Sequence, residues 1–371
     1  MTPDDVRVLE SGPLPIEDRL RRVDCDVHHS LRSLEDLKPF LSRRWWDHLQ
    51  SYGLRMPVPF SGSSPYPKAT PALSRTDSWP PAGGPPGSDL DFMRAQLLDR
   101  YDIQHGLLHL LYPCGMDQRN QAFGAALCRA INEWVVAAWT SQEPRLKAAI
   151  SVPGEDAAAA VAEIEHWAGH PGFVQVAMAT HSIEPLGRRR YWPIYEAAVG
   201  QGYPIGLHTS GYNGNAITPA GWPSFYVEEQ HGVAISQQGV AISLVTEGVF
   251  ARLPELRVVV VEAGFAWVPS VAWRLDRHWS RMRDEVPHLV RPPSEYIREN
   301  LWFTTQPMDE PERPRDLRHI LDWIGWDRVL FASDYPHWDM DSPELGFRLR
   351  MTAEERRAIY GGNACAVYGL A

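Results

Sequence analysis

The sequence has no surplus of positive charge, few cysteines and no long apolar run. It contains 36 Lys and Arg residues against 46 Asp and Glu residues, which gives a formal net charge of −10. A nucleic-acid-binding protein needs basic side chains to neutralise phosphates, so this balance argues against that class of partner. The four cysteines form no C-x-x-C pair, which argues against a structural zinc site and indicates a reducing compartment.

No apolar stretch reaches the length that a transmembrane helix requires, and the first 20 residues are too polar for a signal peptide. We therefore expect a cytoplasmic protein that acts on a small molecule, has no membrane partner and could form a homo-oligomer. We divide the chain into an N-terminal extension over residues 1–20 and a single domain over residues 21–371.

Short apolar runs alternate with amphipathic segments of helical length along the whole domain. The eight runs occupy residues 21–27, 105–111, 146–152, 173–179, 203–209, 256–263, 301–305 and 328–334. Strands that alternate with helices form a parallel sheet, and eight such units favour a closed barrel over an open sheet. The sequence therefore predicts an α/β fold of the (β/α)8 TIM-barrel type.

Two long segments interrupt this alternation. Residues 56–89 are rich in Pro, Gly and Ser and predict no regular element. A loop of this length inside a compact domain is commonly functional, and its position after the first strand and helix predicts a lid-like insertion over the barrel mouth. A second predicted loop, over residues 210–230, follows the fifth apolar run.

Ligand-type side chains end several of the predicted strands. Asp26 and His28 end the first run, His208 the fifth and Asp334 the eighth, while Glu262 follows the four valines of the sixth. Active sites of such barrels lie at the C-terminal ends of the strands. Asp26 and His28 are two positions apart, so both side chains project from the same face of a strand. Converging carboxylates and imidazoles bind divalent metals, so these residues predict a metal site.

Four further polar residues have two interpretations each. Asp24 has the same strand parity as Asp26 but lies deeper, so it is either a second metal ligand or a structural acid. Glu228-x-x-His231 has the spacing found in di-iron helices, and it also suits the polar start of a helix. His337 either orients or protonates a substrate, or it packs behind Asp334. His29 points away from the site.

Aromatic residues are frequent in the predicted rim loops and just beyond the strand ends. They favour a flat or hydrophobic organic substrate, although packing alone would also explain them. These candidates for the pocket wall are Trp79, Tyr212, Trp222, Phe225, Tyr226, Trp267 and Trp338.

Several motifs, in this order, resemble the amidohydrolase-related family of the amidohydrolase superfamily. They are "DCDVHH", "PIGLH", "VVVVEAGFAWVP", "LFASDYPHWD" and "IYGGNACAVYGL". This branch includes aminocarboxymuconate-semialdehyde decarboxylase and resorcylate-type decarboxylases alongside hydrolases. The resemblance implies a distorted eight-stranded barrel and a divalent metal held by Asp26, His28, His208 and Asp334.

The chain departs from the family pattern at three places. The first strand carries Asp-x-His where His-x-His is more common in the superfamily, and Glu262 stands where the decarboxylases carry a histidine after strand 6. The segment "FVQVAMAT" has no lysine, so a carbamylated lysine that bridges two metals in some members is absent. A carboxylate would have to bridge instead.

We compare three mechanisms for this site, each with one or two Zn, Mn or Fe ions. The first is a hydrolase, in which a metal-bound water attacks, Asp334 or Glu262 takes its proton and His337 assists. The second is a non-oxidative decarboxylase of an aromatic or unsaturated acid. It needs a raised pKa at Glu262 and a cation for the substrate, for which Arg188–Arg190 is one candidate. The third is a non-haem (di-)iron monooxygenase. A non-enzymatic protein would bind no metal.

Overall fold

The computed structural model describes residues 20–54, 71–112, 115–116, 118–209, 216–344, 346–347 and 349–371. The N-terminal extension apart from Leu20, residues 56–70 of the predicted lid, and Tyr212 lie outside the described residues. No helix within the described residues is long and apolar enough to cross a membrane.

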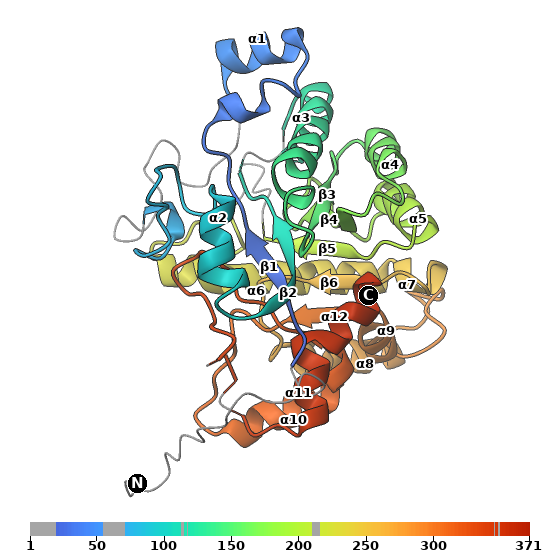
Figure 1. Ribbon diagram of the computed structural model, residues 1–371. Helices are drawn as coiled ribbons and strands as arrows, with labels where there is room; N and C mark the ends of the chain where they lie inside the picture. Colours follow the sequence, from blue (N-terminus) through green and yellow to red (C-terminus); the bar gives the residue numbers. More distant parts are fainter. Residues whose placement is uncertain are drawn as a thin grey trace, which may run out of the picture.

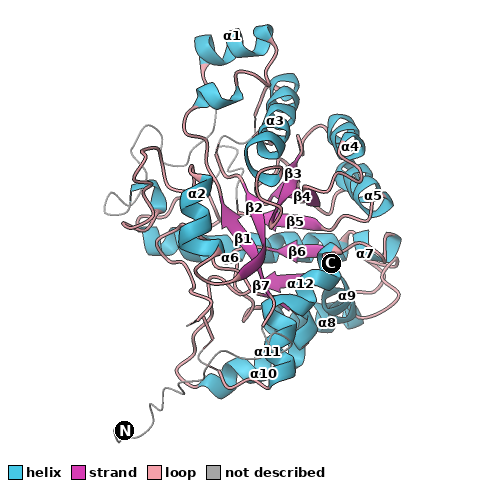
Figure 2. Cartoon of the chain, viewed as in Figure 1, coloured by secondary structure: helices cyan, strands magenta, loops and turns pink. Residues whose placement is uncertain are grey.

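The eight predicted strands are all present and pair in parallel in sequence order (Figures 1 and 2). They are β1 (Arg22–His28), β2 (Ile103–His109), β3 (Leu146–Ser151), β4 (Phe173–Ala179), β5 (Ile205–His208), β6 (Val258–Val260), β7 (Leu301–Thr304) and β8 (Val329–Leu330). The predicted α/β barrel is therefore confirmed. The last strand is shorter than predicted, so Asp334 lies in the loop that follows β8.

Backbone hydrogen bonds between β1 and the segment after β8 close the barrel. The Cys25 N–H donates to the Phe331 carbonyl (2.9 Å), the Asp334 N–H to the Asp26 carbonyl (3.1 Å) and the His28 N–H to the Tyr335 carbonyl (2.7 Å). The closure is irregular because β8 itself has ended, which is the distortion that the family resemblance implied. It also places Asp334 directly beside Asp26.

Helices surround the sheet in an outer layer (Figure 2). They are α1 (Arg43–Tyr52), α2 (Leu90–Met93), α3 (Gln121–Val135), α4 (Ala157–His166), α5 (Trp192–Gly200), α6 (Tyr226–Thr246), α7 (Val249–Arg252), α8 (Val268–Arg281), α9 (Pro293–Asn300), α10 (Pro314–Ile324), α11 (Ala353–Arg357) and α12 (Asn363–Tyr368). The last helix, α12, contributes Val367 and Tyr368 to an apolar cluster with Val23, Cys25 and Leu330. The C-terminal helix thereby packs against β1 and β8.

The prediction of a loop over residues 210–230 is wrong at its end, because α6 already begins at Tyr226. The Glu228 carboxylate accepts the N–H groups of Ser224 and Phe225, both at 2.9 Å. A glutamate at this position satisfies N–H groups at a helix start that would otherwise lack partners. Glu228 therefore caps the N-terminus of α6.

The described part of the predicted insertion, residues 71–89, lies against the loops that follow β1 and β8. Ser30 donates its N–H to the Gly87 carbonyl (2.9 Å), and Arg75 donates to the Pro336 carbonyl (3.0 Å). The Trp338 N–H donates to the Leu73 carbonyl (2.8 Å). This part of the insertion therefore borders the C-terminal end of the barrel, and its action as a lid remains a prediction.

Candidate metal centre

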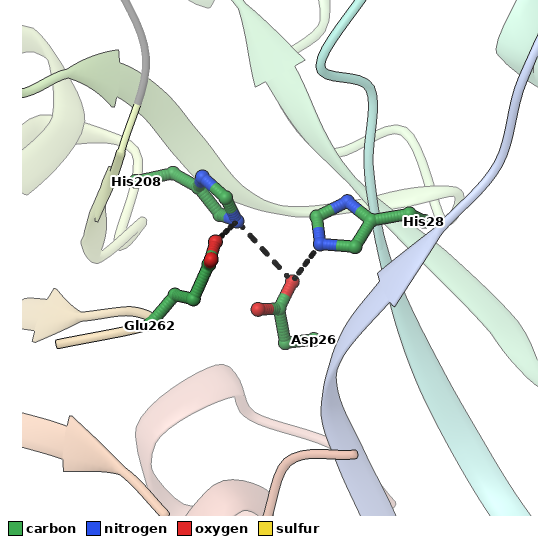
Figure 3. Close-up of side chains that lie close together, drawn as sticks. All are labelled: Asp26, His28, His208 and Glu262. Atoms are coloured by element: carbon green, nitrogen blue, oxygen red, sulfur yellow. Dashed lines mark ion pairs between the residues drawn. The ribbon is translucent and has the colours of Figure 1, made fainter. Parts of the chain in front are cut away.

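Four of the predicted ligands point toward one another at the C-terminal end of the barrel (Figure 3). Asp26 and His28 come from β1, His208 ends β5 and Glu262 follows β6, with one donor atom of each within 4.8 Å of all the others. His208 Nε2 lies 3.5 Å from Asp26 Oδ1 and 3.4 Å from Glu262 Oε2, and His28 Nε2 lies 3.3 Å from Asp26 Oδ1. The convergence that the strand-end rule predicted is present, and the ligand roles are taken up below as a proposal.

The two histidines of this group present the same ring nitrogen to its centre. His28 Nδ1 donates to the His109 carbonyl and His208 Nδ1 to the Thr209 carbonyl, both at 3.0 Å. In its neutral form, with the proton at Nδ1, each imidazole would offer the lone pair of Nε2. Burial also lowers the pKa of His28, which favours this neutral form.

A second group shares His28 with the first and adds Asp334 and His337. Asp334 Oδ1 lies 2.8 Å from His28 Nε2 and 2.7 Å from His337 Nδ1, and the His337 ring stacks on that of His28 at 4.4 Å. His337 thus lies behind Asp334, as one of its two interpretations required. Both Asp334 and Glu262 are in reach of the cluster as further ligands.

Glu262 and Asp334 have a backbone conformation that is uncommon for residues other than glycine. Their φ angles are 56° and 62°, in the left-handed region that non-glycine residues rarely adopt. Such a conformation costs on the order of 1–3 kcal/mol and persists where the surroundings hold it. The Glu262 N–H is held by Thr304 Oγ1 at 3.0 Å. This backbone conformation determines the direction in which the Glu262 and Asp334 side chains project at the barrel rim.

The cluster concentrates negative charge in a buried place. Burial, and then the charge of Asp334, raises the pKa of Glu262 well above its ordinary value, and burial does the same at Asp334. Burial opposes ionisation at Asp26 too, but His28 and His208 hold its pKa well below the usual range. Burial lowers the pKa of His208, but the charge of Asp26, the hydrogen bond to Asp26 and the charge of Glu262 together raise that pKa to about 9.

These residues fit a divalent cation. Asp26 Oδ2 and Asp334 Oδ2 are buried and accept no hydrogen bond from any residue that the structure describes. A buried carboxylate oxygen without a partner is costly, and a bound cation would supply that partner. Carboxylate and imidazole donors together suit Mn, Zn or Fe(II).

Sequence reasoning missed His109, which ends β2. Its Nδ1 lies 2.9 Å from Asp26 Oδ1, and its Nε2 lies 2.8 Å from Gln175 Nε2 of β4. The Gln175 amide donates to His109 Nε2, so the ring proton is on Nδ1 and is donated to Asp26. This hydrogen bond orients the Asp26 carboxylate. His109 lies in the apolar run "HGLLHLL" and ends a strand, as His208 does, so the strand-end rule could have found it. No sequence pattern marks Gln175 as a site residue.

We expect His109→Leu to weaken binding of Mn²⁺ by about 10- to 100-fold, because Asp26 loses the donor that orients it. His109→Gln retains an amide N–H and should recover part of the affinity. Titration of both metal-free variants with Mn²⁺, followed by calorimetry, measures the difference. Equal affinity of His109→Leu and the unmodified protein would show that the contact has no influence on the site.

Gly206 of β5 makes room for Gln175. A Cβ atom at this position would lie 2.0 Å from Gln175 Nε2 and 2.4 Å from its side-chain carbonyl carbon. We expect Gly206→Ala to push Gln175 away from His109 and to lower the free energy of unfolding by about 1–3 kcal/mol. A matched control is Gly200→Ala, where an added Cβ would meet nothing within 4 Å. Denaturant unfolding compares the two, and equal stability of both variants would contradict the steric argument.

Three other predicted residues lie outside both groups. Asp24 is buried and accepts the N–H of Ser333 at 2.9 Å and its hydroxyl at 2.6 Å, so it acts as a structural acid between β1 and the segment after β8. Burial raises the pKa of Asp24 to about 7. Glu228 caps α6, and the exposed His231 donates from Nδ1 to the Val227 carbonyl at 2.9 Å. The structure does not bring these residues to the cluster as additional ligands.

A cavity of about 390 Å³ opens beside Glu262, between α6 and the loops after β6, β7 and β8. Of the predicted pocket residues, Tyr226 and Trp338 line it. Trp267 instead packs edge-on against Phe303 at 5.8 Å and donates to the Ala263 carbonyl, and it is not among the residues that line this cavity.

The remaining pocket candidates and the candidate cation lie elsewhere. Trp79, Trp222 and Phe225 are exposed and do not line this cavity, and Tyr212 is outside the described residues. Within Arg188–Arg190, Arg188 pairs with Glu247 and Arg190 with Glu184. These arginines therefore form surface ion pairs and do not reach the cavity.

A family model and the sequences of characterised proteins match most of this chain. A model described as amidohydrolase matches residues 23–370. The chain is 25% identical over 300 residues to the gamma-resorcylate decarboxylase of Polaromonas sp. strain JS666, which covers 76% of this chain and 88% of that protein. It is 24% identical over 290 residues to the gamma-resorcylate decarboxylase of Rhizobium sp. strain MTP-10005, with coverages of 74% and 85%.

Solved structures show the same fold. Dihydroxybenzoic acid decarboxylase of Polaromonas sp. JS666, with bound manganese and 2-nitroresorcinol, has a TM-score of 0.66 at 19% identity, with 95% of this chain and 98% of that chain covered. The 5-carboxyvanillate decarboxylase of Sphingomonas paucimobilis has a TM-score of 0.68 at 20% identity, with 95% and 100% covered.

Proposed function

The chain belongs to the amidohydrolase family, and on this premise we propose that it is a metal-dependent, non-oxidative decarboxylase of an aromatic carboxylic acid. The observation that carries the proposal is the position of Glu262, whose side chain belongs to the metal-ligand cluster and also lines the cavity of about 390 Å³. A proton donor is thus adjacent to a space that suits a ring. The named relatives support this ranking, which places decarboxylation ahead of the hydrolysis that the sequence alone favoured.

Asp26, His28 and His208 would hold the divalent ion, with Asp334 as a further ligand. When bound, the ion would supply positive charge for the substrate's carboxylate and an adjacent oxygen. The buried oxygens of Asp26 and Asp334 that lack hydrogen-bond partners among the described residues support this assignment. His109 keeps Asp26 oriented, and His337 keeps Asp334 oriented.

Glu262 delivers the proton in this proposal. A new C–H bond forms at the ring carbon that bears the carboxylate, and the bond between that carbon and the carboxylate then breaks. Its electron pair returns to the ring and CO₂ leaves. Glu262, now ionised, recovers its proton from water that enters through the cavity. Glu262 is preferred over Asp334 as the donor because only Glu262 lines the cavity.

Hydrolysis is the second candidate because of one contact. Asp334 Oδ1 lies 2.7 Å from His337 Nδ1, and such a pair could accept a proton from an attacking water. Oxygenation has no comparable support from the geometry, since Glu228 and His231 lie outside the cluster.

The test incubates the Mn²⁺-loaded protein in D₂O with a panel of hydroxybenzoates and aminobenzoates, and separately with aryl esters and anilides. We expect CO₂ release from a benzoate, with deuterium on the ring carbon that lost the carboxylate. Cleavage of an ester or anilide without any decarboxylation would favour hydrolysis and contradict the proposal.

A further inference from the structure

The cavity beside Glu262 has aromatic walls that are held in place. The Trp338 Nε1–H donates to the Tyr226 hydroxyl at 3.2 Å, and the two ring centroids lie 6.3 Å apart at an angle of 55°. Tyr226 begins α6 and Trp338 follows the β8 segment, so this hydrogen bond ties two sides of the cavity together. Met308 and Pro307, after β7, add an apolar surface.

The charged residues that line the cavity are acids. They are Glu262, Asp309 and Asp339; the described lining also includes the imidazole of His231, but neither Lys nor Arg. Some other sheltered acids among the described residues have arginine partners. Glu143, for example, lies 2.9 Å from both Arg94 and Arg145.

Two of the three lining acids already have a partner or a role. Asp309 Oδ2 accepts the N–H groups of Phe265 (2.9 Å) and Ala266 (2.8 Å), just before α8. Glu262 belongs to the metal-ligand cluster. Asp339, which is half-buried, forms no ion pair with any Lys, Arg or His side chain in the described parts of the chain. The Asp339 side chain has a hydrogen bond with Gln306 and an electrostatic interaction with His337. It is therefore the acid of the cavity whose charge has no Lys or Arg partner and no ion pair among the described residues.

We propose that the substrate carries a basic amine nitrogen at the end remote from its carboxylate, with the ammonium group bound between the Tyr226 and Trp338 rings and Asp339. The inference rests on the proposed function, which directs the substrate's carboxylate toward the metal-ligand cluster. An ammonium group gains both from a carboxylate and from aromatic faces. A second carboxylate at this position would face the carboxylates of Asp339 and Glu262, which repel it.

Three probes that differ at one substituent test the proposal: 4-(aminomethyl)benzoate, 4-(hydroxymethyl)benzoate and benzene-1,4-dicarboxylate. Calorimetry on the Mn²⁺-loaded protein should give a Kd for the amine at least about tenfold lower than for the alcohol, with the dicarboxylate weakest. In Asp339→Asn, the amine and the alcohol should bind within about threefold of each other while the metal content is unchanged. Glu344→Gln, an exposed change of equal charge outside the cavity, should keep the tenfold preference.

Four outcomes would overturn the inference: equal binding of amine and alcohol, tighter binding of the dicarboxylate, binding of none of the probes, or loss of metal in Asp339→Asn. The series on the unmodified protein decides the question even if that variant does not fold. Because binding needs no turnover, the two proposals separate. A preference for the amine without CO₂ release from any benzoate would contradict only the proposed function, and CO₂ release without the preference would contradict only this inference.

Discussion

Asp26→Ala is expected to abolish metal binding at micromolar concentrations and to lower turnover by about 10³-fold or more. Among the described residues, Asp26 is the one acid contacted by both cluster histidines and by His109, at 3.3, 3.5 and 2.9 Å. A bound ion contributes several kcal/mol of charge stabilisation, and each 1.4 kcal/mol corresponds to about tenfold in rate.

The matched control for this variant is Asp24→Asn in the same strand. Asp24 is equally buried but bonded to Ser333 and outside both ligand groups. We expect this control to lose stability while it keeps its metal. Elemental analysis after desalting reports the metal in both variants, and a full complement in Asp26→Ala would remove Asp26 from the ligand set.

Glu262→Gln should keep the metal and lower turnover by about 10²- to 10⁴-fold, because the amide has the same shape but no proton to donate. The pH dependence provides a second readout. Burial raises the pKa of Glu262, so the active protonated form persists to higher pH and kcat/KM falls as the pH rises through that pKa. This alkaline fall should be absent from the residual activity of Glu262→Gln.

Glu229→Gln serves as the control, since Glu229 lies on α6 but does not line the cavity. Its turnover should match that of the unmodified protein. If Glu262→Gln loses its metal together with its activity, Glu262 is a ligand, and the Asp334–His337 pair would then have to carry the proton.

Much of the site could be predicted because it follows from periodicity and topology. The spacing of Asp26 and His28 places both on one face of β1, and the rule that barrel sites lie at strand ends brings His208 and Glu262 to the same rim. Both placements follow without the details of packing, and the structure confirms that these four side chains converge.

The parts that could not be predicted depend on contacts between distant segments. The left-handed backbone at Asp334 arises after β8 has ended, where the chain pairs with β1 to close the barrel. Glu228 was a candidate ligand by spacing, yet its carboxylate is used by the start of α6. Gln175 reaches His109 only because Gly206 leaves the space, and no local pattern marks that pair.

The positions of aromatic residues in the sequence predicted the lining of the cavity least well. Tyr226 and Trp338 line the cavity, but Trp267 packs against Phe303 and Trp222 is exposed. A rim loop brings an aromatic side chain near the site without determining the direction in which it points. Direction depends on partners such as the hydrogen bond from Trp338 to Tyr226.

We propose that the cluster at the barrel rim holds a single catalytic divalent ion, and elemental analysis of the gently purified protein tests this most directly. We expect about one manganese or zinc ion per chain. About two irons per chain would contradict it and make oxygen activation the leading mechanism, and no metal under any condition would contradict every metal-dependent mechanism considered for this chain.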